Sequence, residues 1–203
     1  MENVLHLCGD AAADPAWSHE SHGVTFYTFP LAVARLSGTV DTLTVAAPAA
    51  MCRDLNAGAH IRLFGQVRSH TSRGPEGSHL RILAWAKSLE ICEDPPANRV
   101  SLRGVVCRRP VYRCTPYGRE ITDIMLRAER TAPPGASPRR LRCDYIPCVT
   151  WGSVARLCAV LEPGAQVRFE GRLQSRGYTK LADGVPQQRT AWEVSVARYE
   201  PLG

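Results

Sequence analysis

An internal repeat constrains this chain more than any other feature of its sequence. The segment Asn3–Gly9 (NVLHLCG) recurs as Asn98–Gly104 (NRVSLRG), at an offset of 95 residues. The same offset relates further identical residues: Pro15 and Pro110, Gly23 and Gly118, Leu31 and Leu126, Arg35 and Arg130. Self-similarity over a long stretch of chain is the signature of repeated structural units. The sequence is therefore predicted to form two copies of one unit.

The offset changes along the chain, which locates insertions in the second copy. Asp41 matches Asp144 at an offset of 103, and the pattern that starts at Leu55 returns from Leu161 at an offset of 106. Two prolines, Pro95 and Pro96, prevent a strand or helix from continuing between the copies. We therefore predict a first domain at residues 1–94, a linker at 95–97 and a second domain at 98–203.

Each unit is predicted to be mostly β, because short runs of alternating apolar residues are bounded by turn residues. In the second unit these runs are Val100–Cys107, Ile121–Arg130, Asp144–Trp151, Gln166–Arg176 and Thr190–Tyr199. Between the third and fourth runs, Ser153–Leu161 has helical spacing and ends before Pro163 and Gly164. Five strands with one short helix at this place are the plan of the OB fold, a Greek-key barrel. The fold class predicted is all-β, with two tandem five-stranded OB-fold barrels, each with one short helix between strands 3 and 4.

Positive charge is concentrated in the second unit. Residues 1–95 hold seven Arg and Lys against ten Asp and Glu, whereas residues 96–203 hold 18 against nine, within a net charge of +6. Such asymmetry indicates that one half of a chain meets a polyanion. A solvated basic surface without a partner is the alternative.

The second unit resembles the bacterial single-stranded DNA-binding protein family over residues 98–200. These motifs carry the resemblance: Asn98-Arg99-Val100 with Gly104; Pro110, Arg113, Thr115-Pro116 and Gly118; Asp144-Tyr145-Ile146-Pro147 with Val149 and Trp151-Gly152; Gly164; Glu170 to Arg176 with Tyr178. In the first unit the resemblance is limited to the glycine framework and Gly65–Ser69. The resemblance implies sequence-independent binding of single-stranded DNA in replication, recombination or repair, without catalysis. It also implies a homo-oligomer, with a dimer of two-barrel chains favoured.

Many members of this family end in an acidic tail that recruits other proteins. This chain ends at Tyr199–Gly203 without one, which predicts DNA coating without that recruitment.

Aromatic and basic side chains of the second unit are predicted to share its outer surface. Alternate residues of a strand face the same side, so Tyr145 and Trp151 project together, opposite Ile146 and Cys148. On the fourth strand the outward residues are Arg168, Arg172, Gln174 and Arg176, and Tyr178 keeps their parity. By family resemblance, Tyr145, Trp151 and Tyr178 match positions where a ring stacks on a base, and further stacking candidates are Tyr112 and Tyr117. The phosphate-binding candidates are Arg113, Arg119, Arg139, Arg140, Arg142, Arg172, Arg176 and Lys180. Arg139, Arg140 and Arg142 lie in the segment 131–142, which is longer in the second copy, and Lys180 lies in the loop after Tyr178, which is also longer there.

The first unit lacks these features. The places of Tyr145, Trp151 and Tyr178 are taken by Thr42, Pro48 and Ser72. Its own aromatic residues are expected in the core or an interface: Trp17, Phe26, Tyr27 and Phe29. We therefore predict a degenerate barrel that serves pairing between chains or between domains.

The sequence predicts neither a metal nor a cofactor. The eight cysteines contain no C-x-x-C pair and precede no pair of histidines at zinc-finger spacing, so buried free thiols are expected. His19–His22 is one residue short of the H-E-x-x-H motif and lies in no helical pattern. No catalytic constellation or small-molecule site is recognised.

Apolar runs are too short for a membrane span and the N-terminus lacks the features of a secretion signal, so we expect a cytoplasmic, nucleoid-associated protein.

Two other functions remain open at this point. The chain could be an interaction module that assembles with replication or mobilisation proteins and touches DNA only weakly. It could also bind RNA, since stacking does not distinguish RNA from DNA.

Overall fold

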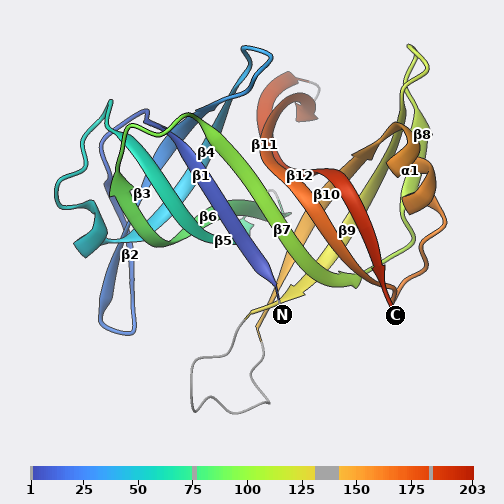
Figure 1. The fold of residues 1–203 in the computed structure, drawn as a ribbon, viewed down its shortest axis with the longest axis horizontal. Helices are drawn as coiled ribbons and strands as arrows, with labels where there is room; N and C mark the ends of the chain where they lie inside the picture. Colours follow the sequence, from blue (N-terminus) through green and yellow to red (C-terminus); the bar gives the residue numbers. More distant parts are fainter. Residues whose placement is uncertain (1, 75–76, 131–141, 183–184) are drawn as a thin grey trace.

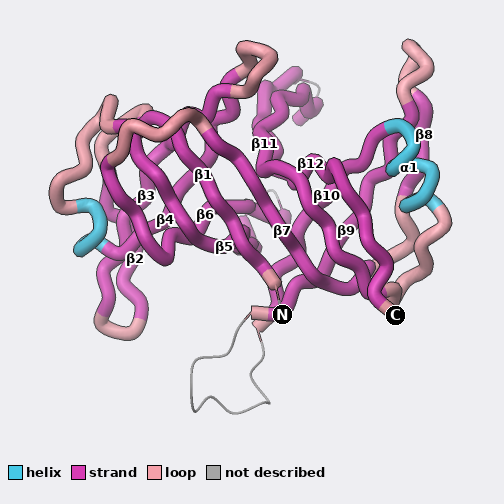
Figure 2. The backbone as a smooth tube through the Cα atoms, in the orientation of Figure 1, coloured by secondary structure: helices cyan, strands magenta, loops and turns pink. Residues whose placement is uncertain are grey.

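The computed structural model describes the chain from residue 2 to residue 203, apart from 75–76, 131–141 and 183–184 (Figure 1). It contains two barrels built from strands in the same order. The elements of the first barrel are β1 (Asn3–Ala11), β2 (Ala16–Ser21), β3 (Val24–Ala34), β4 (Val40–Pro48), a single 3-10 turn (Ala49–Cys52), β5 (His60–Gly74) and β6 (Gly77–Ile91). Those of the second are β7 (Ala97–Val106), β8 (Val111–Cys114), β9 (Glu120–Glu129), β10 (Cys143–Trp151), α1 (Gly152–Ala159), β11 (Gln166–Ala182) and β12 (Val185–Leu202). The prediction of an all-β chain is confirmed, as the predominance of strand in Figure 2 shows.

Each barrel has one more strand than the five predicted, because its first strand is interrupted at a proline. Pro15 and Pro110 have no amide hydrogen to donate, and each lies between two segments that pair with the same neighbour. β1 and β2 both pair with β3, and β7 and β8 both pair with β9. Parallel pairing of β4 with β6, and of β10 with β12, closes each barrel.

The predicted short helix is an α-helix in the second barrel only. There α1 begins one residue before the predicted segment and ends two residues before its end. The first barrel has a four-residue 3-10 helix in this place, so both barrels have a short helix here and only its type differs. The offset of the repeat grows by three residues between the third strand and Leu161. The first copy therefore lacks the residues needed for a second helical turn.

Glycines of the repeat mark a close approach between strands. A Cβ atom on Gly171 would lie 2.0 Å from the carbonyl oxygen of Ser195, and one on Gly65 would lie 2.1 Å from that of Trp85. Both glycines follow a register shift, between β5 and β6 in the first barrel and between β11 and β12 in the second. Only a residue without a side chain fits this bulge.

The two barrels join through their first strands. β1 pairs antiparallel with β7 around Leu5 and Val100, which are equivalent residues of the repeat. A pairing centred on equivalent residues relates the two barrels by an approximate two-fold axis. The twelve strands thus form one continuous sheet, in which β1 and β7 lie side by side (Figure 1).

Reciprocal polar contacts reinforce this junction. Asp144 of β10 accepts hydrogen bonds from Arg130, at 2.9 and 2.7 Å, and from the backbone amide of Ser69 in the other barrel, at 2.7 Å. The equivalent residues make the equivalent contacts: Asp41 is bonded to Arg35, at 2.6 and 2.5 Å, and to the amide of Ser175, at 2.9 Å. Both aspartates are buried. The β5–β6 hairpin of the first barrel thus contacts β10 of the second, and the β11–β12 hairpin of the second contacts β4 of the first.

The core of each barrel is mainly aliphatic, with one fully buried phenylalanine at its centre. Its largest fully buried side chains include Phe29, Leu31 and Leu63 in the first barrel and Phe169, Leu126 and Ile146 in the second. Within the described residues, no helix is both long and apolar enough to cross a membrane.

Candidate nucleic-acid interface

Two of the predicted stacking residues lie on the outer face of β10. Tyr145 is 47 % exposed and Trp151 is 41 % exposed, whereas Ile146 and Cys148 between them are buried in the core. The alternation of the strand produces this arrangement, because β10 pairs with β9 without a break from Cys143 to Trp151. Both rings therefore project from the same side of one strand.

Cross-strand register brings basic residues to the same face. Directly opposed residues in neighbouring strands point to the same side of a sheet. One row runs from Arg113 in β8 through Ile121 to Trp151. The next row contains Val111, Asp123, Val149, Ser195 and Arg172. Arg113, Trp151 and Arg172 thus share the outer face of the second barrel.

Arg113 is held in place by an exposed ion pair. Its Nε lies 2.9 Å from a carboxylate oxygen of Asp123, and its second nitrogen lies 3.4 Å from the other oxygen. This bond raises the pKa of Arg113 above its ordinary value. The Arg113 side chain is 48 % exposed, so its guanidinium is held in position by Asp123 and can still be reached by an anion from solvent.

Tyr178 and Arg176 lie on the β11–β12 hairpin. Tyr178 is 37 % exposed, and the guanidinium carbon of Arg176 lies 5.9 Å from the centre of its ring, within the range of a cation–π contact. Arg176 also donates to Glu193 at 3.3 Å. An exposed ring with a cation beside it offers both a stacking surface and a charge to a nucleotide.

Two outward-facing residues of β11 are less accessible than their parity predicts. Gln174 is buried, because it donates to Glu193 at 2.9 Å and accepts from Arg172 at 3.2 Å. Arg172 is half-buried, and burial, together with the nearby charge of Arg35, lowers its pKa. Arg172 is thus directed toward the junction of the barrels and exposes less of its guanidinium than Arg113 does.

Tyr112 does not join the other rings. Its partner in the β8–β9 ladder is Thr122, which points into the barrel, so Tyr112 faces the side opposite Trp151. Its hydroxyl donates to Glu120 at 2.6 Å, and this bond raises the pKa of Tyr112 to about 12. The prediction that groups Tyr112 with the stacking residues is therefore not supported by its orientation. Tyr117 lies in the turn after β8 and is 92 % exposed.

The remaining phosphate candidates lie in loops. Arg119 is exposed in the turn before β9, and Arg142 is exposed immediately before β10. Arg139, Arg140 and the side chain of Lys180 lie outside the described residues.

The first barrel differs from expectation in two respects. Trp17 is 69 % exposed on β2, so it does not lie in the core and its place in an interface stays a prediction, whereas Phe26 and Phe29 are buried as expected. Phe64, which the sequence did not single out, is 45 % exposed and stacks on His6 with 4.5 Å between the ring centres. His19 and His22 lie on a strand and its turn, which is the geometry expected from their lack of helical pattern.

The expectation of isolated buried thiols holds only in part. Cys52, Cys148 and Cys158 are buried, but Cys107 and Cys114 are exposed. Cys8 is buried beside His60 and Cys92, and these three potential metal ligands lie within 4.8 Å of one another.

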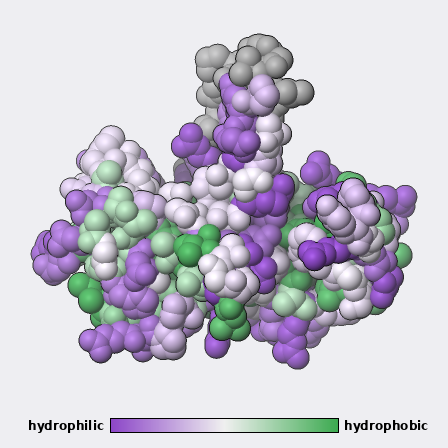
Figure 3. Space-filling view, turned by 90° about the horizontal axis from the view of Figure 1, so that it is seen from above, coloured by the Kyte–Doolittle hydropathy of each residue, from purple (hydrophilic) through white to green (hydrophobic). Residues whose placement is uncertain are grey.

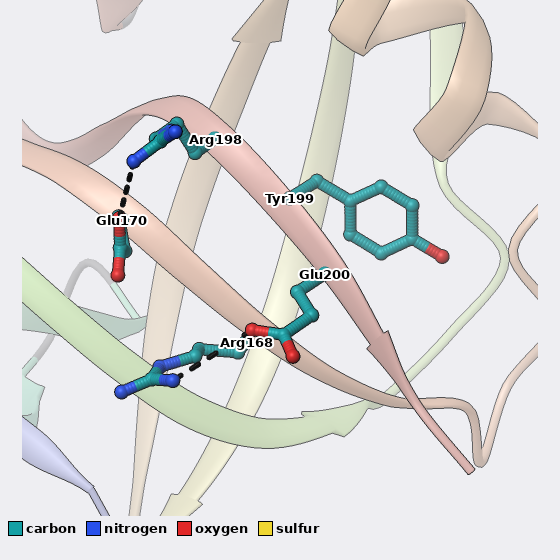
Figure 4. A pocket seen from close by; sticks show the side chains of 5 residues that line it. All are labelled: Arg168, Glu170, Arg198, Tyr199 and Glu200. Carbon is teal, nitrogen blue, oxygen red and sulfur yellow. Dashed lines mark ion pairs between the residues drawn. The ribbon is translucent and has the colours of Figure 1, made fainter.

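The surface around these features is mixed in character. Figure 3 shows small apolar patches separated by polar surface on the face seen from above. A charged hollow lies on the paired segments of β11 and β12 near the start of β11 and the end of β12. It is lined by Arg168, Glu170, Arg198, Tyr199 and Glu200 (Figure 4). Its charges are paired: Arg168 lies 3.7 Å from Glu200, and Arg198 lies 3.8 Å from Glu170. This hollow is therefore less suited to holding an anion than the face that carries Trp151.

Comparison with known proteins gives a family for the second barrel. The profile of the family described as "Single-strand binding protein family" matches residues 97–202. Single-stranded DNA-binding protein A of Bacillus subtilis is 37 % identical over 82 residues, which are 40 % of this chain and 46 % of that protein. Single-stranded DNA-binding protein 2 of Listeria innocua is 34 % identical over 82 residues, 40 % of this chain and 50 % of that protein. The chain thus spans about half the length of these curated relatives.

Solved structures match both barrels together. The wild-type single-stranded DNA binding protein from Thermus aquaticus superimposes with a TM-score of 0.74 at 20 % identity, covering 100 % of this chain and 93 % of that one. A deletion mutant of the same protein gives a TM-score of 0.76 at 19 % identity, covering 99 % and 94 %. These matches confirm the predicted fold of two tandem OB barrels.

Proposed function

Because this chain belongs to the single-strand binding protein family, we propose that its second barrel binds single-stranded DNA without sequence preference. One observation carries the proposal: the exposed rings of Trp151 and Tyr145 share an outer face with Arg113, and Tyr178 with Arg176 extends it along the β11–β12 hairpin. Such a face offers flat surfaces to bases and cations to phosphates. The role is binding and protection of unwound DNA, without catalysis, in the bacterial cytoplasm and nucleoid.

The energetics suit sequence-tolerant binding. A base stacked on an aromatic ring contributes about 1–3 kcal/mol whatever the base, so three rings supply roughly 3–9 kcal/mol. Each phosphate neutralised by an arginine releases counterions, and on single strands the slope of log K against log salt is about −0.7 per contact. If the four exposed arginines Arg113, Arg119, Arg142 and Arg176 each meet one phosphate, the expected slope is about −3.

The first barrel has a different proposed role. The first barrel is proposed to pair with the second. The β1–β7 ladder and the reciprocal contacts of Asp41 and Asp144 support this role. We further propose that two such chains associate as a homodimer. Light scattering would then give twice the mass of one chain, and the mass of a single chain would contradict this part of the proposal.

A matched pair of tryptophan variants tests the DNA interface. Trp151→Ala removes a ring from the proposed face, and Trp17→Ala removes an exposed ring from the first barrel. Affinity for a fluorescein-labelled oligo-dT is measured by anisotropy at low salt, so that the reporter does not depend on the tryptophans. Trp151→Ala is expected to weaken binding by about 5- to 150-fold, the equivalent of 1–3 kcal/mol. Trp17→Ala is expected to leave the affinity unchanged.

The same assay separates the competing functions. Wild-type protein that fails to bind oligo-dT at low salt would favour the interaction module over a DNA-binding role. Tighter binding to oligo-rU than to oligo-dT would favour RNA as the ligand. Equal losses in Trp151→Ala and Trp17→Ala would overturn the assignment of the binding face.

A further inference from the structure

Three side chains with metal-ligating atoms converge on the outer face of the first barrel. Cys8 lies on β1, His60 at the start of β5, and Cys92 immediately after β6. The Cys8 Sγ lies 3.3 Å from Nε2 of His60 and 3.6 Å from the Sγ of Cys92. All three ligand atoms lie within 4.8 Å of one another. Residues separated by 52 and 32 positions in the sequence thus form one cluster.

The spacing of these atoms is that of a tetrahedral zinc site. Zinc binds thiolate sulfur at about 2.3 Å and imidazole nitrogen at about 2.0–2.1 Å. Tetrahedral angles then place two sulfurs about 3.8 Å apart and a sulfur and a nitrogen about 3.5 Å apart. The observed separations of 3.6 and 3.3 Å are each within a few tenths of an ångström of these values. One ion therefore fits between the three atoms with only small movements.

The surroundings of His60 also fit a metal ligand. Nε2 faces the two sulfurs, and Nδ1 lies 2.6 Å from a carboxylate oxygen of Asp10. A metal-bound histidine commonly donates its other ring N–H to a carboxylate, which fixes the tautomer and orients the ring. The carbonyl oxygen of Asp94 lies 2.8 Å from Nε2, at hydrogen-bond distance, so zinc binding would replace this hydrogen bond by the bond from Nε2 to the metal.

The charges of the site balance. Two thiolates neutralise one divalent zinc ion, so the loaded cluster carries no net charge. The nearest guanidinium, that of Arg62, is paired with Asp94 at 2.5 Å and with Glu90 at 2.9 Å. It therefore adds little repulsion toward the ion.

The cluster is not part of the framework that both barrels share. At the equivalent positions of the second copy stand Arg103, Gln166 and Leu202 in place of Cys8, His60 and Cys92. We propose that Cys8, His60 and Cys92 bind one Zn²⁺ ion, which fastens the linker between the barrels to the outer face of the first. In the structure β6 ends at Ile91 and β7 begins at Ala97, so the linker is the segment 92–96; Cys92 begins it, and Cys8 pairs with Ala97 at its far end. The ion would thus hold both ends of the linker beside the β1–β7 ladder.

Cobalt and zinc binding test this proposal on the full chain, purified under reducing conditions and stripped with a chelator. Added Co²⁺ is expected to give one equivalent of tetrahedral visible absorption together with thiolate-to-cobalt charge transfer in the near ultraviolet. Zn²⁺ is expected to displace it and to raise the unfolding temperature. Cys92→Ser, at a half-buried linker position, is expected to abolish both effects. Cys107→Ser, which removes an exposed thiol elsewhere, is the matched control and is expected to change neither.

A second variant keeps the test decisive if Cys92→Ser perturbs the fold. Asp10 is 63 % exposed, so Asp10→Asn preserves packing and removes only the partner of His60. Loss of such a partner is expected to weaken zinc binding about 10- to 100-fold while the thiolate-to-cobalt band remains. Three results would overturn the proposal: no charge-transfer band in the wild type, equal metal binding in Cys92→Ser, or a Cys8–Cys92 disulfide that takes up no metal after reduction.

Discussion

Replacing Asp144 by alanine tests whether the buried polar contacts at the junction stabilise the two-barrel unit. The side chain of Asp144 is 1 % exposed and accepts two hydrogen bonds from Arg130 and two from Ser69 of the other barrel, through its amide and its hydroxyl, and Arg68 lies 3.6 Å away. Its removal leaves the side chains of Arg130, 27 % exposed, and Arg68, 17 % exposed, without this charged partner, and leaves the Ser69 amide without its acceptor. Breaking a buried ion pair by removing one partner costs about 3–5 kcal/mol. Because Arg130 retains some access to water, we expect a loss of about 3 kcal/mol in the free energy of unfolding.

Asp123→Ala is the matched control for this prediction. Asp123 makes the same kind of two-point contact with an arginine, but the two side chains are 44 % and 48 % exposed. Exposed ion pairs contribute about 0–1 kcal/mol. Urea unfolding followed by circular dichroism and tryptophan fluorescence measures both losses. A loss below about 1 kcal/mol for Asp144→Ala, or an equal loss for the two variants, would refute the argument from burial.

Two further perturbations are predicted from local geometry. Gly171→Ala is expected to destabilise the protein strongly in the same urea assay, since the new Cβ would lie 2.0 Å from the Ser195 carbonyl oxygen. Gly177→Ala, with nothing within 4 Å, should be neutral or slightly stabilising, and equal effects would contradict the packing argument. Glu2→Gln is expected to cost about 1 kcal/mol or less at pH 7, because hydrogen bonds from Arg168 and Ser101 lower the pKa of Glu2 below 4.5. Stabilisation by a carboxylate with a lowered pKa is complete above pH 4.5 and is lost as the pH falls through the lowered value. Melting curves of the wild type and Glu2→Gln should therefore converge in acid; a constant difference from pH 7 to pH 3 would show that the charge of Glu2 is not responsible.

Periodicity and the repeat were sufficient to predict the barrels and the faces of their central strands. The alternation around Tyr145 and Trp151 determines which side chains enter the core, because an unbroken ladder preserves the parity of β10. The orientation of Tyr112 was not predictable in this way. It depends on which residue of β9 stands opposite after the interruption at Pro110, and a sequence carries no direct signal of that register.

The sequence also gave no sign of contacts made between elements that are far apart in the chain. Gln174 and Arg172 have outward parity, yet neighbouring strands and the junction cover them. Cys8, His60 and Cys92 follow no zinc-motif spacing, because β1, β5 and the end of β6 bring them together from three places in the sequence. The sequence feature that distinguishes these three residues is that the second copy of the repeat has none of them at the equivalent positions.

Comparison of the two copies separates the residues that build the unit from those that give each barrel its own role. Residues retained in both copies include those at the bulges and the junction: the glycines at 65 and 171, the Arg–Asp pairs, and the serines that bond them across the axis. Each of these contacts joins one barrel to the other, so a change in either copy removes a contact on which the position of both barrels depends. The outer faces carry no such constraint. One face has kept Tyr145 and Trp151, where the other has Thr42 and Pro48, and only the latter barrel has the Cys8 cluster. The proposed DNA site thus lies on an outer face that the approximate symmetry leaves free to change, whereas the proposed metal site lies beside the β1–β7 ladder and uses residues that the second copy lacks.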